Sequence, residues 1–324
     1  MIQQALALFR LDGAEYELIR HNENMTYKVA AQGKNYLLRI HQPMQGFVLI
    51  GQPDATERRA RIESEMALLA ALHAQGSVPV QRPVACGKGG LTAALPDGVC
   101  VTLLEWIEGT PLDTIEITPA ILRNVGRMTA RLHRFSEAYT SPFEGYRYTQ
   151  AMLPLITRQI ELGAGARAFT APQAQTMEAA LEEIRRRFDK LDQTHQKHAV
   201  HADLTKSNLL LDAEGNIAPI DFGLCGVGHF LMDLGGLFGT FFQDAQRVEL
   251  LRGYQDERGC AVNPCDIEPY FALQVILFIA CQHRRAGGWD WFGAAMERWC
   301  REIFTPLAQR TPFLLSNMSE ASCL

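Results

Sequence analysis

A short polar segment enclosed by apolar runs constrains this chain more than any other part of its sequence. Between residues 198 and 223 the chain reads H-x-D-x-x-x-x-N and then D-F-G, with four polar residues in this order: His201, Asp203, Asn208 and Asp221. Apolar runs on either side predict short strands, so the polar residues fall on the loops that join them. We expect the first loop to turn Asp203 and Asn208 into one cleft, and the next hairpin to return Asp221 beside them.

The first third of the chain carries the signals of a small antiparallel sheet. Three runs with β-branched and aromatic residues are separated by polar turns: Glu15–His21, Met25–Ala31 and Asn35–His41. Apolar residues at helical spacing then predict one helix over Ala55–Gln75, which Gly76 ends. Turn residues at 96–98 predict a further hairpin. Together these elements predict a small α+β domain over residues 1–104.

The rest of the chain is predicted to be mainly helical. Thr118 can cap a helix that has Pro119 in its first position. Further helical patterns occupy residues 171–194, 244–258, 266–285 and 289–309. The polar segment with its short β-like runs is the exception within this part. We therefore predict a helical part over 111–324, joined to the sheet part by a linker over 105–110.

Charge and hydropathy exclude several classes of partner. The chain of 324 residues has 31 Lys and Arg against 36 Asp and Glu, and its formal charge of −5 offers no general attraction to nucleic acid or an anionic membrane. The most apolar run, Tyr270–Cys281, has 12 residues, whereas a membrane-spanning helix needs about 20. The N-terminus has no signal-peptide pattern, and the eight cysteines form no C-x-x-C pair. We expect a cytoplasmic protein with free thiols, no nucleic-acid partner and no membrane contact.

The polar segment has the composition of a phosphoryl-transfer site. In kinase-like enzymes one carboxylate accepts the proton of the acceptor hydroxyl, while an amide and a second carboxylate hold a metal ion. Asp203, Asn208 and Asp221 supply these groups in the required order. Oxygen ligands of this kind, together with the phosphates of ATP, suit Mg²⁺.

An iron site is a second chemical interpretation of the same residues. The two-histidine, one-carboxylate triad of a non-haem iron oxygenase could be drawn from His201, Asp203 and either His229 or His283. Sites of that kind usually sit on a double-sheet β-barrel, whereas the chain after Gly223 is predicted to be helical. The context therefore favours phosphoryl transfer.

On these motifs the chain resembles the aminoglycoside phosphotransferase and choline kinase-like family, the small-molecule relatives of the protein kinases, over roughly residues 15–300. The resemblance implies a bilobal, protein kinase-like α+β fold with ATP and Mg²⁺ between the lobes. It implies that Asp203 is the catalytic base and that Asn208 and Asp221 are magnesium ligands. A bracing role in the catalytic loop is implied for two more residues, His201 and Asp233.

The resemblance also implies a nucleotide site in the first lobe. A strand cation holds the α- and β-phosphates there and pairs with a helix carboxylate. Arg39 and Glu65 occupy those places, with Glu63 as the rival to Glu65. The first hairpin lacks a glycine-rich motif, so Asn24 and Thr26 are its candidate phosphate contacts, although a plain hairpin turn is the alternative.

The linker is implied to bind adenine through the backbone carbonyl of Glu105 and the backbone N–H of Ile107. Two departures from the family pattern stand in the catalytic loop. Ala202 replaces a usual glycine, and Thr205 replaces a histidine that many members have. The alanine could alter how closely the backbone approaches the acceptor.

Acceptor recognition has the weakest sequence signal. Trp289, Asp290 and Trp291 combine aromatic rings with an acid and could cage an ammonium group through cation–π and charge contacts. The basic run at 283–285 could instead receive a carboxylate, which would indicate an amino-acid-like acceptor. Core packing at a helix start and a basic helix C-terminus explain the same residues without any ligand.

These patterns together predict transfer of the ATP γ-phosphoryl group to a hydroxyl of a small molecule: an aminoglycoside, choline or ethanolamine, or a homoserine-like compound. Two alternatives stay open, an atypical protein Ser/Thr kinase and a catalytically silent nucleotide-binding module. The first is opposed by the short path from Gly223 to Asp233, which contains no A-P-E sequence and no long activation loop. The second is opposed by the presence of both motif carboxylates, the amide and a strand cation.

Overall fold

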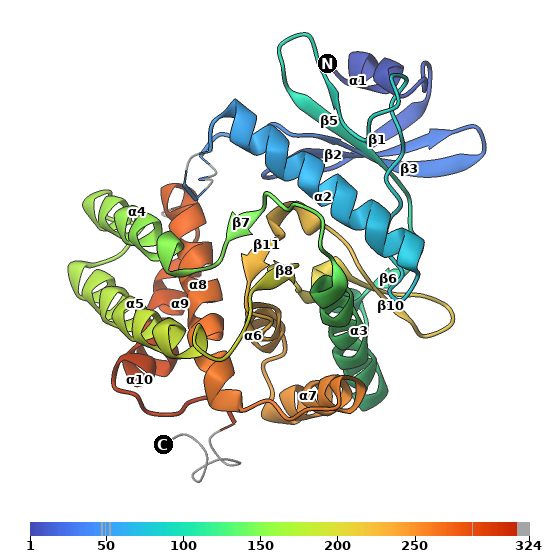
Figure 1. The fold of residues 1–324 in the computed structure, drawn as a ribbon. Helices are drawn as coiled ribbons and strands as arrows, with labels where there is room; N and C mark the ends of the chain where they lie inside the picture. The colour runs from blue at the N-terminus through green and yellow to red at the C-terminus, as the bar shows by residue number, and fades with distance from the viewer. Residues whose placement is uncertain (47, 49, 52, 287, 316–324) are drawn as a thin grey trace.

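The computed structural model of the chain describes residues 1–46, 48, 50–51, 53–286 and 288–315 (Figure 1). Two parts are visible along the chain, a sheet with one long helix at the N-terminal end and a larger helical assembly after it. The predicted α+β class, with an antiparallel sheet first and helices after it, is confirmed. The boundaries at 104 and 111 stay a prediction.

The N-terminal sheet is antiparallel and has the strand order β1-β2-β3-β5-β4. Its strands are β1 (Glu15–His21), β2 (Met25–Ala31), β3 (Lys34–Ile40), β4 (Ala93–Ala94) and β5 (Cys100–Glu105). A short helix, α1 (Ile2–Leu8), which the sequence did not predict, packs its Leu6 into the same core as Leu38 and Val29. Because successive side chains of a strand alternate between faces, the neighbours of Leu38 on β3 face away from that core.

The long helix α2 (Ala55–Gln75) lies between the sheet and the helical part (Figure 1). Asp54 and Glu57 form a reciprocal capping box at its start, and Gly76 adopts a left-handed φ of 75° at its end. The predicted bounds of this helix are therefore confirmed, and both ends have a local chemical cause.

The helical part contains seven main helices among the described residues: α3 (Pro119–Ala138), α4 (Leu153–Gly165), α5 (Ala171–Leu191), α6 (Leu231–Thr240), α7 (Asp244–Arg258), α8 (Pro264–Ala286) and α9 (Phe292–Trp299). A π-turn over Cys300–Phe304 and the short α10 (Thr305–Ala308) follow. Helices α3 and α7 approach closely because Gly126 and Gly253 have no side chains, and a Cβ on either would collide with the opposite backbone. The sequence prediction omitted α4.

Two small sheets hold the polar segment in place within the helical part. One has the order β10-β9-β6, from β6 (Thr110–Pro111), β9 (Leu209–Leu211) and β10 (Ile217–Pro219). The other has the order β7-β11-β8, from β7 (Tyr146–Arg147), β8 (His198–Val200) and β11 (Gly226–Gly228). The predicted strands on both sides of the catalytic loop are confirmed, while β7 and β11 were missed because each is too short to show a period.

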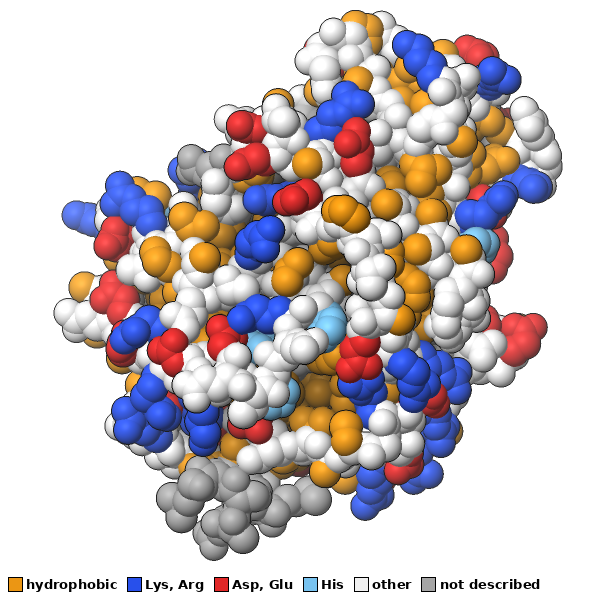
Figure 2. Space-filling view, in the orientation of Figure 1, with side chains coloured by type: hydrophobic (Ala, Val, Ile, Leu, Met, Phe, Trp, Pro, Cys, Tyr) orange, Lys and Arg blue, Asp and Glu red, His pale blue; other side chains and the backbone are white. Residues whose placement is uncertain are grey.

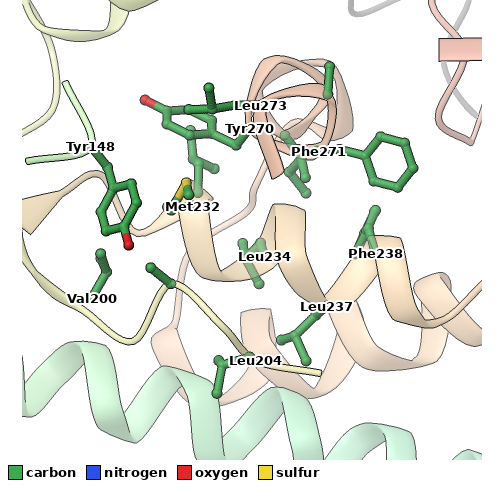
Figure 3. Packing of buried hydrophobic residues seen from close by; sticks show 14 of the residues in the cluster. Tyr148, Val200, Leu204, Met232, Leu234, Leu237, Phe238, Tyr270, Phe271 and Leu273 are labelled. Carbon is green, nitrogen blue, oxygen red and sulfur yellow. The ribbon is translucent and has the colours of Figure 1, made fainter. Parts of the chain in front are cut away.

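Apolar residues within and beside the polar segment, such as Val200 and Leu204, belong to one large apolar core, part of which is drawn in Figure 3. Leu204, which follows the loop aspartate, is fully buried and lies beside Leu237 of α6. Tyr270 and Leu273 of α8 lie in the same core. Helix α8 is long and apolar enough to span a membrane by length and composition, but 67% of its most apolar window is buried inside the molecule. It packs as a core helix.

Basic and acidic side chains are mixed on the surface, and most of the described cysteines are free. Lys and Arg side chains are interspersed with Asp and Glu over the face shown in Figure 2. Six of the described cysteines are free thiols, but Cys265 is disulfide-bonded, so the expectation of free thiols is wrong for that residue. The sequence could not show this because the spacing of cysteines does not state which of them meet in space.

Candidate active site

The catalytic loop between β8 and β9 is built around His201. The imidazole Nδ1 accepts a hydrogen bond from the backbone N–H of Asp203 at 3.2 Å, and Nε2 lies 3.1 Å from the carbonyl oxygen of Ile220. Nε2 therefore carries the proton, because a carbonyl can only accept. The ring also packs against the ring of Phe222, with 4.3 Å between the two centroids. Burial lowers the pKa of His201. One neutral histidine thus ties the loop of Asp203 to the strand that leads into D-F-G.

Asp233 on α6 closes the same loop from below. Its fully buried carboxylate accepts the backbone N–H groups of His201 at 3.1 Å and Ala202 at 2.6 Å, and it lies 3.0 Å from Nε2 of His133. Burial opposes the charge, but the hydrogen bonds and charges of His133, His201 and the Ala202 N–H together hold the pKa of Asp233 below its usual value. Ala202 adopts a left-handed φ of 63°, which glycine would accept with less strain. Asp233 therefore makes the contacts that the predicted bracing role requires.

Asp203 is fixed by the amide of Asn208. The Asn208 Nδ2 donates to the Asp203 carboxylate at 2.8 Å and to its backbone carbonyl at 3.0 Å. Burial, and then the charge of Asp221, raise the pKa of Asp203 to about 7. The amide oxygen of Asn208 remains available for another partner because both contacts use its nitrogen.

Asp221 begins the D-F-G turn in a left-handed conformation with φ of 65°. Its carboxylate forms an ion pair with Arg20 of β1, and Nη1 of Arg39 lies 3.8 Å away. The second lobe is thereby linked to two strands of the first. Sequence reasoning did not single out Arg20, because an arginine at the end of an edge strand is usually a solvated residue.

Arg39 of β3 pairs with Glu65 of α2 at 2.5 Å, and both residues are buried. Glu63, the rival partner, faces outward and pairs with Arg59 on its own helix. The two glutamates are two residues apart on the same helix and therefore face nearly opposite sides of it, so only the three-dimensional register of α2 distinguishes them. Removing either residue of this buried ion pair would leave the charge of the other buried without a partner, which costs folding free energy.

Glu23 at the tip of the β1–β2 hairpin was missed by the sequence prediction, although it stands beside Asn24. Burial, then the charges of Asp221 and Asp203, raise the pKa of Glu23 to about 8. Three carboxylates therefore share one region, opposed by Arg20 and Arg39. The sequence feature that could have identified Glu23 is its position as the one acidic residue between two asparagines in the turn Asn22-Glu23-Asn24.

Of the other predicted nucleotide contacts, two lie at the same cleft and two lie in the linker. Asn24 and Thr26 line the cavity beside Asp203, and Thr26 pairs in register with Arg39. In the linker, the backbone carbonyl of Glu105, which is the group predicted to bind adenine, lies 3.5 Å from Nε2 of Gln81. The backbone N–H of Glu105 bonds the carbonyl oxygen of Arg82 at 2.8 Å. Ile107 lies in the irregular connection between β5 and β6.

A cavity of about 240 Å³ opens between the β1–β2 hairpin, the catalytic loop and α8. Its lining includes Glu23, Asp203 and Asp221, and the rings of Tyr146 and Tyr148. Sequence reasoning missed both tyrosines because β7 is far from the catalytic motif along the chain. Tyr148 is held in place by a hydrogen bond from its hydroxyl to the carbonyl oxygen of Leu224 at 2.6 Å.

The residues predicted for the acceptor lie outside the lining of this cavity. Trp289 and Trp291 stack at 5.3 Å between ring centroids, and both contact Phe278, whose ring does line the cavity. Asp290, between them, is also absent from the lining. Arg285 of the rival basic run lies 5.9 Å from the ring of Trp289. The structure therefore groups these aromatic residues beside the cavity but not in it.

The iron interpretation fails on geometry. His229 lies 2.6 Å from a carboxylate oxygen of Asp192, and His283 lies 3.1 Å from the side-chain oxygen of Gln159. Among the residues that the structure describes, no cluster of three or more His, Cys, Asp or Glu is arranged to hold a metal ion. His201 is therefore without a second histidine for such a triad.

Comparisons with known proteins agree with the fold. A model of the phosphotransferase enzyme family matches residues 15–263. A microcompartment-associated aminopropanol kinase superposes with a TM-score of 0.72 at 24% identity, covering 94% of this chain and 98% of that one. The amicoumacin kinase hAmiN, in complex with AMP-PNP, Ca²⁺ and Ami, superposes with a TM-score of 0.72 at 19% sequence identity. The superposition covers 97% of this chain and 94% of that one. The choline kinase LicA from Streptococcus pneumoniae superposes with a TM-score of 0.62 at 16% sequence identity, over 91% of this chain and 93% of that one.

Curated relatives match over shorter segments. The CBL-interacting protein kinase 4 of Oryza sativa subsp. japonica is 26% identical over 197 residues, which cover 58% of this chain and 40% of that protein. The serine/threonine-protein kinase CHK1 of Mycosarcoma maydis is 36% identical over 83 residues, which cover 25% and 12%. The chain spans less than half the length of the curated relatives that it matches.

Proposed function

Because the chain belongs to the phosphotransferase enzyme family, we propose that it transfers the γ-phosphoryl group of ATP to a hydroxyl of a small molecule with the help of Mg²⁺. One observation carries the proposal. Asp203, Asn208 and Asp221 lie around one cleft, which the buried Arg39–Glu65 pair borders from the first lobe.

Asp203 acts as the general base in this proposal. Its carboxylate lines the cavity and is oriented by the amide of Asn208, so it can accept the proton of a hydroxyl that enters there. The backbone of the loop is fixed by hydrogen bonds: Asp233 accepts two consecutive N–H groups, and the His201 side chain accepts the next one. Positioning of this kind is the main protein contribution to phosphoryl transfer.

The residues present fit a divalent cation. Asp221 offers carboxylate oxygens and Asn208 an unused amide oxygen, which are the hard ligands that Mg²⁺ prefers. Burial, and then the neighbouring carboxylates, raise the pKa values of Glu23 and Asp203, and a cation bound here would neutralise that negative charge. When bound, the ion would supply charge neutralisation to the phosphates of ATP, with phosphate oxygens and water as its further ligands.

Arg39 is assigned to the α- and β-phosphates, and Glu65 keeps its guanidinium in position. Asn24 and Thr26 of the hairpin are assigned to the phosphates as well, since both line the cleft. The linker backbone at Glu105 and Ile107 is assigned to adenine. Arginine in place of lysine keeps the charge and widens the fork of donors.

A small acceptor is favoured over a protein acceptor by the chain that follows D-F-G. Only β11 separates the turn that ends at Leu224 from α6, which begins at Leu231. Protein kinases carry a long activation segment at this place. The matches to two protein kinases keep that class as the second candidate, and the structural neighbours, which include aminopropanol, amicoumacin and choline kinases, support the first.

An ATP-consumption screen tests the proposal. Hydroxylated amines, amino acids, sugars, aminoglycosides and a generic protein substrate are offered with ATP, with and without Mg²⁺, to the parent and to Asp203→Asn. We expect acceptor-dependent ADP formation by the parent that needs Mg²⁺ and is lost in the variant. Turnover of the protein substrate alone, or equal turnover by the variant, would overturn it.

A further inference from the structure

Strand β1 changes its register immediately before Arg20. Leu18 pairs with Tyr27 of β2. The next paired residue of β1 is Arg20, which pairs with Thr26. Ile19 is therefore an extra residue with no partner on β2, and such a β-bulge commonly turns a side chain beside an active site. Because Ile19 is 48% exposed, packing in the core does not account for the bulge.

The bulge aims Arg20 at the face of the sheet that borders the cleft. Residues of an unbroken strand alternate between faces, so without the extra residue the side chain at position 20 would lie on the same face as Leu18. With the bulge, Arg20 lies opposite Thr26, and Thr26 lies opposite Arg39 of β3. Directly opposite residues share a face of the sheet. The two arginines thus form a row with the threonine between them, and both Arg20 and Thr26 line the cavity.

The two arginines of this row meet at the Asp221 carboxylate, but they differ in freedom. Arg20 forms an ion pair with one carboxylate oxygen, and Nη1 of Arg39 lies 3.8 Å from the other. Arg39 has a second partner in Glu65, and its side chain is 3% exposed, compared with 43% for Arg20. Among the described residues, Arg20 pairs with no carboxylate besides that of Asp221. When that carboxylate serves the proposed metal site, the Arg20 guanidinium is left without its partner.

The cavity beside Asp203 offers the freed guanidinium a partner of opposite charge. Arg20 is the single Lys or Arg among the described residues that line the cavity. The γ-phosphoryl group has to enter this space, because Asp203 is the proposed base for the hydroxyl that receives it. In the transition state of phosphoryl transfer the charge is spread over three equatorial oxygens. A guanidinium suits that charge because its donors are forked and it stays protonated.

Resting on the proposed phosphoryl transfer, we propose that Arg20 is a catalytic residue that leaves Asp221 and binds the γ-phosphoryl group of ATP. The acceptor oxygen forms a bond to the γ-phosphorus as the bond from that phosphorus to the β–γ bridging oxygen breaks. ADP leaves with the bridging oxygen, and the hydroxyl proton passes to Asp203. Arg20 donates hydrogen bonds to the transferred oxygens, while Arg39 holds the α- and β-phosphates. The observed pair of Arg20 and Asp221 is then the arrangement of the nucleotide-free protein.

Paired nucleotides test this contact directly. ADP lacks the γ-phosphate that AMP-PNP carries, so the ratio of the two affinities isolates the contribution of that group. In calorimetry with Mg²⁺, Arg20→Met should reduce the preference for AMP-PNP over ADP by about tenfold, as the loss of a charge-assisted hydrogen bond predicts. Arg39→Met in the same row should weaken both nucleotides alike. Arg158→Met is the matched control, because this exposed arginine of α4 pairs with Glu161 outside the cavity lining and should change neither affinity.

Metal binding without nucleotide tests the exchange of partners. In this proposal Arg20 and a divalent cation compete for the same Asp221 carboxylate. Titration of the nucleotide-free protein with Mn²⁺, followed by electron paramagnetic resonance, should therefore give a several-fold higher affinity for Arg20→Met than for the parent. Arg20→Lys keeps the charge and should stay closer to the parent.

Steady-state kinetics provide the catalytic readout with an acceptor identified by the ATP-consumption screen. Arg20→Met should lower kcat by about tenfold or more, because the charge of the transition state loses a donor. The Michaelis constant for the acceptor should change little, since Arg20 is assigned to the phosphoryl group. Arg20→Lys should recover part of the lost kcat.

The outcomes separate this inference from the function on which it rests. The expected shift in nucleotide preference without turnover of any acceptor would remove the phosphotransferase proposal and leave Arg20 as a γ-phosphate ligand. Turnover by the parent, with a preference for AMP-PNP that Arg20→Met does not change, would keep the function and overturn the role of Arg20. Equal weakening of both nucleotides by Arg20→Met, or an unchanged affinity for Mn²⁺, would also overturn it.

Discussion

The loop that holds Asp203 and the cavity beside it are built in opposite ways. The loop takes its parts from one stretch of chain, where Asp203, His201 and Asp233 bond to one another's backbone and side chains. The described residues that line the cavity come from six separate segments, including the hairpin tip at Glu23 and the β3–α2 connection at Val48. The comparison teaches that the spacing of the proposed catalytic groups is set locally, whereas the shape of the cavity depends on how distant segments meet.

The largest effect should come from breaking the local part. Asp203→Asn keeps the shape of the side chain and removes its ability to accept a proton, so turnover should fall by about 10²-fold or more. Nucleotide binding should stay nearly unchanged, because Asp203 is not assigned to ATP. Steady-state kinetics and calorimetry with ADP measure the two separately. Near-parental turnover on a proven acceptor would contradict the role of Asp203 as the base.

Asp221→Ala tests the metal part of the same region. The variant should lose the magnesium-dependent share of ATP affinity, because Asp221 offers the charged oxygens of the proposed site. Calorimetric titration of ATP with and without Mg²⁺ provides the comparison, with the parent as reference. Equal enhancement by the metal in parent and variant would remove Asp221 from the metal site.

Arg39 and Glu65 should show effects that depend on each other. Arg39→Ala should weaken the use of ATP by roughly tenfold or more while leaving affinity for the acceptor largely intact, since its proposed contact is with the phosphates. The double variant with Glu65→Ala should lose less than the product of the single effects, because the two side chains form one buried pair. Michaelis constants for ATP and acceptor provide the test, and simple additivity would contradict the pairing.

Arg39→Lys sharpens that test. If charge is what matters, lysine retains substantial activity, as the commoner arrangement of the family predicts. If the forked guanidinium must contact Glu65 and the phosphates together, lysine behaves like alanine. The two outcomes decide which property of Arg39 the site uses.

The pH dependence of folding stability tests whether burial and neighbouring carboxylates raise the pKa of Asp203. Asp203, with a pKa raised to about 7, binds its proton more tightly in the folded state than in the unfolded state. It therefore contributes stability at low pH that is lost as pH rises through 7. In the metal-free protein Asp203→Asn should be more stable than the parent by about 1–3 kcal/mol above pH 7, with the difference shrinking towards pH 4. Thermal unfolding with EDTA measures it, and a difference independent of pH would contradict the raised pKa.

The smallest effect is expected at the aromatic cluster beside the cavity. Trp291→Ala should change the Michaelis constant for the acceptor by less than about twofold, because Trp291 lies outside the cavity lining. A matched change at the lining, Tyr146→Ala, should raise it well beyond that. A large effect at Trp291 would return the acceptor site to the place that the sequence first indicated.

Much of the fold was predictable because its causes are local. The bounds of α2 follow from a capping aspartate, an apolar stripe and Gly76, all of which can be read within 23 residues. Thr118 and Pro119 likewise begin α3, where the Thr118 hydroxyl accepts the N–H of Ile121 at 3.3 Å. Strands β7 and β11 were missed because they are stabilised only by neighbours that arrive from elsewhere in the chain.

The sequence by itself determined the order and spacing of Asp203, Asn208 and Asp221, and with them the class of chemistry. The choice of Glu65 over Glu63, the place of Glu23 above the catalytic carboxylates, and the place of Val48 in the cavity lining were decided only by the tertiary structure. The physical reason is range. Capping, turn formation and motif spacing act between residues a few positions apart, whereas helix register and cavity shape arise from packing between segments that the sequence does not pair.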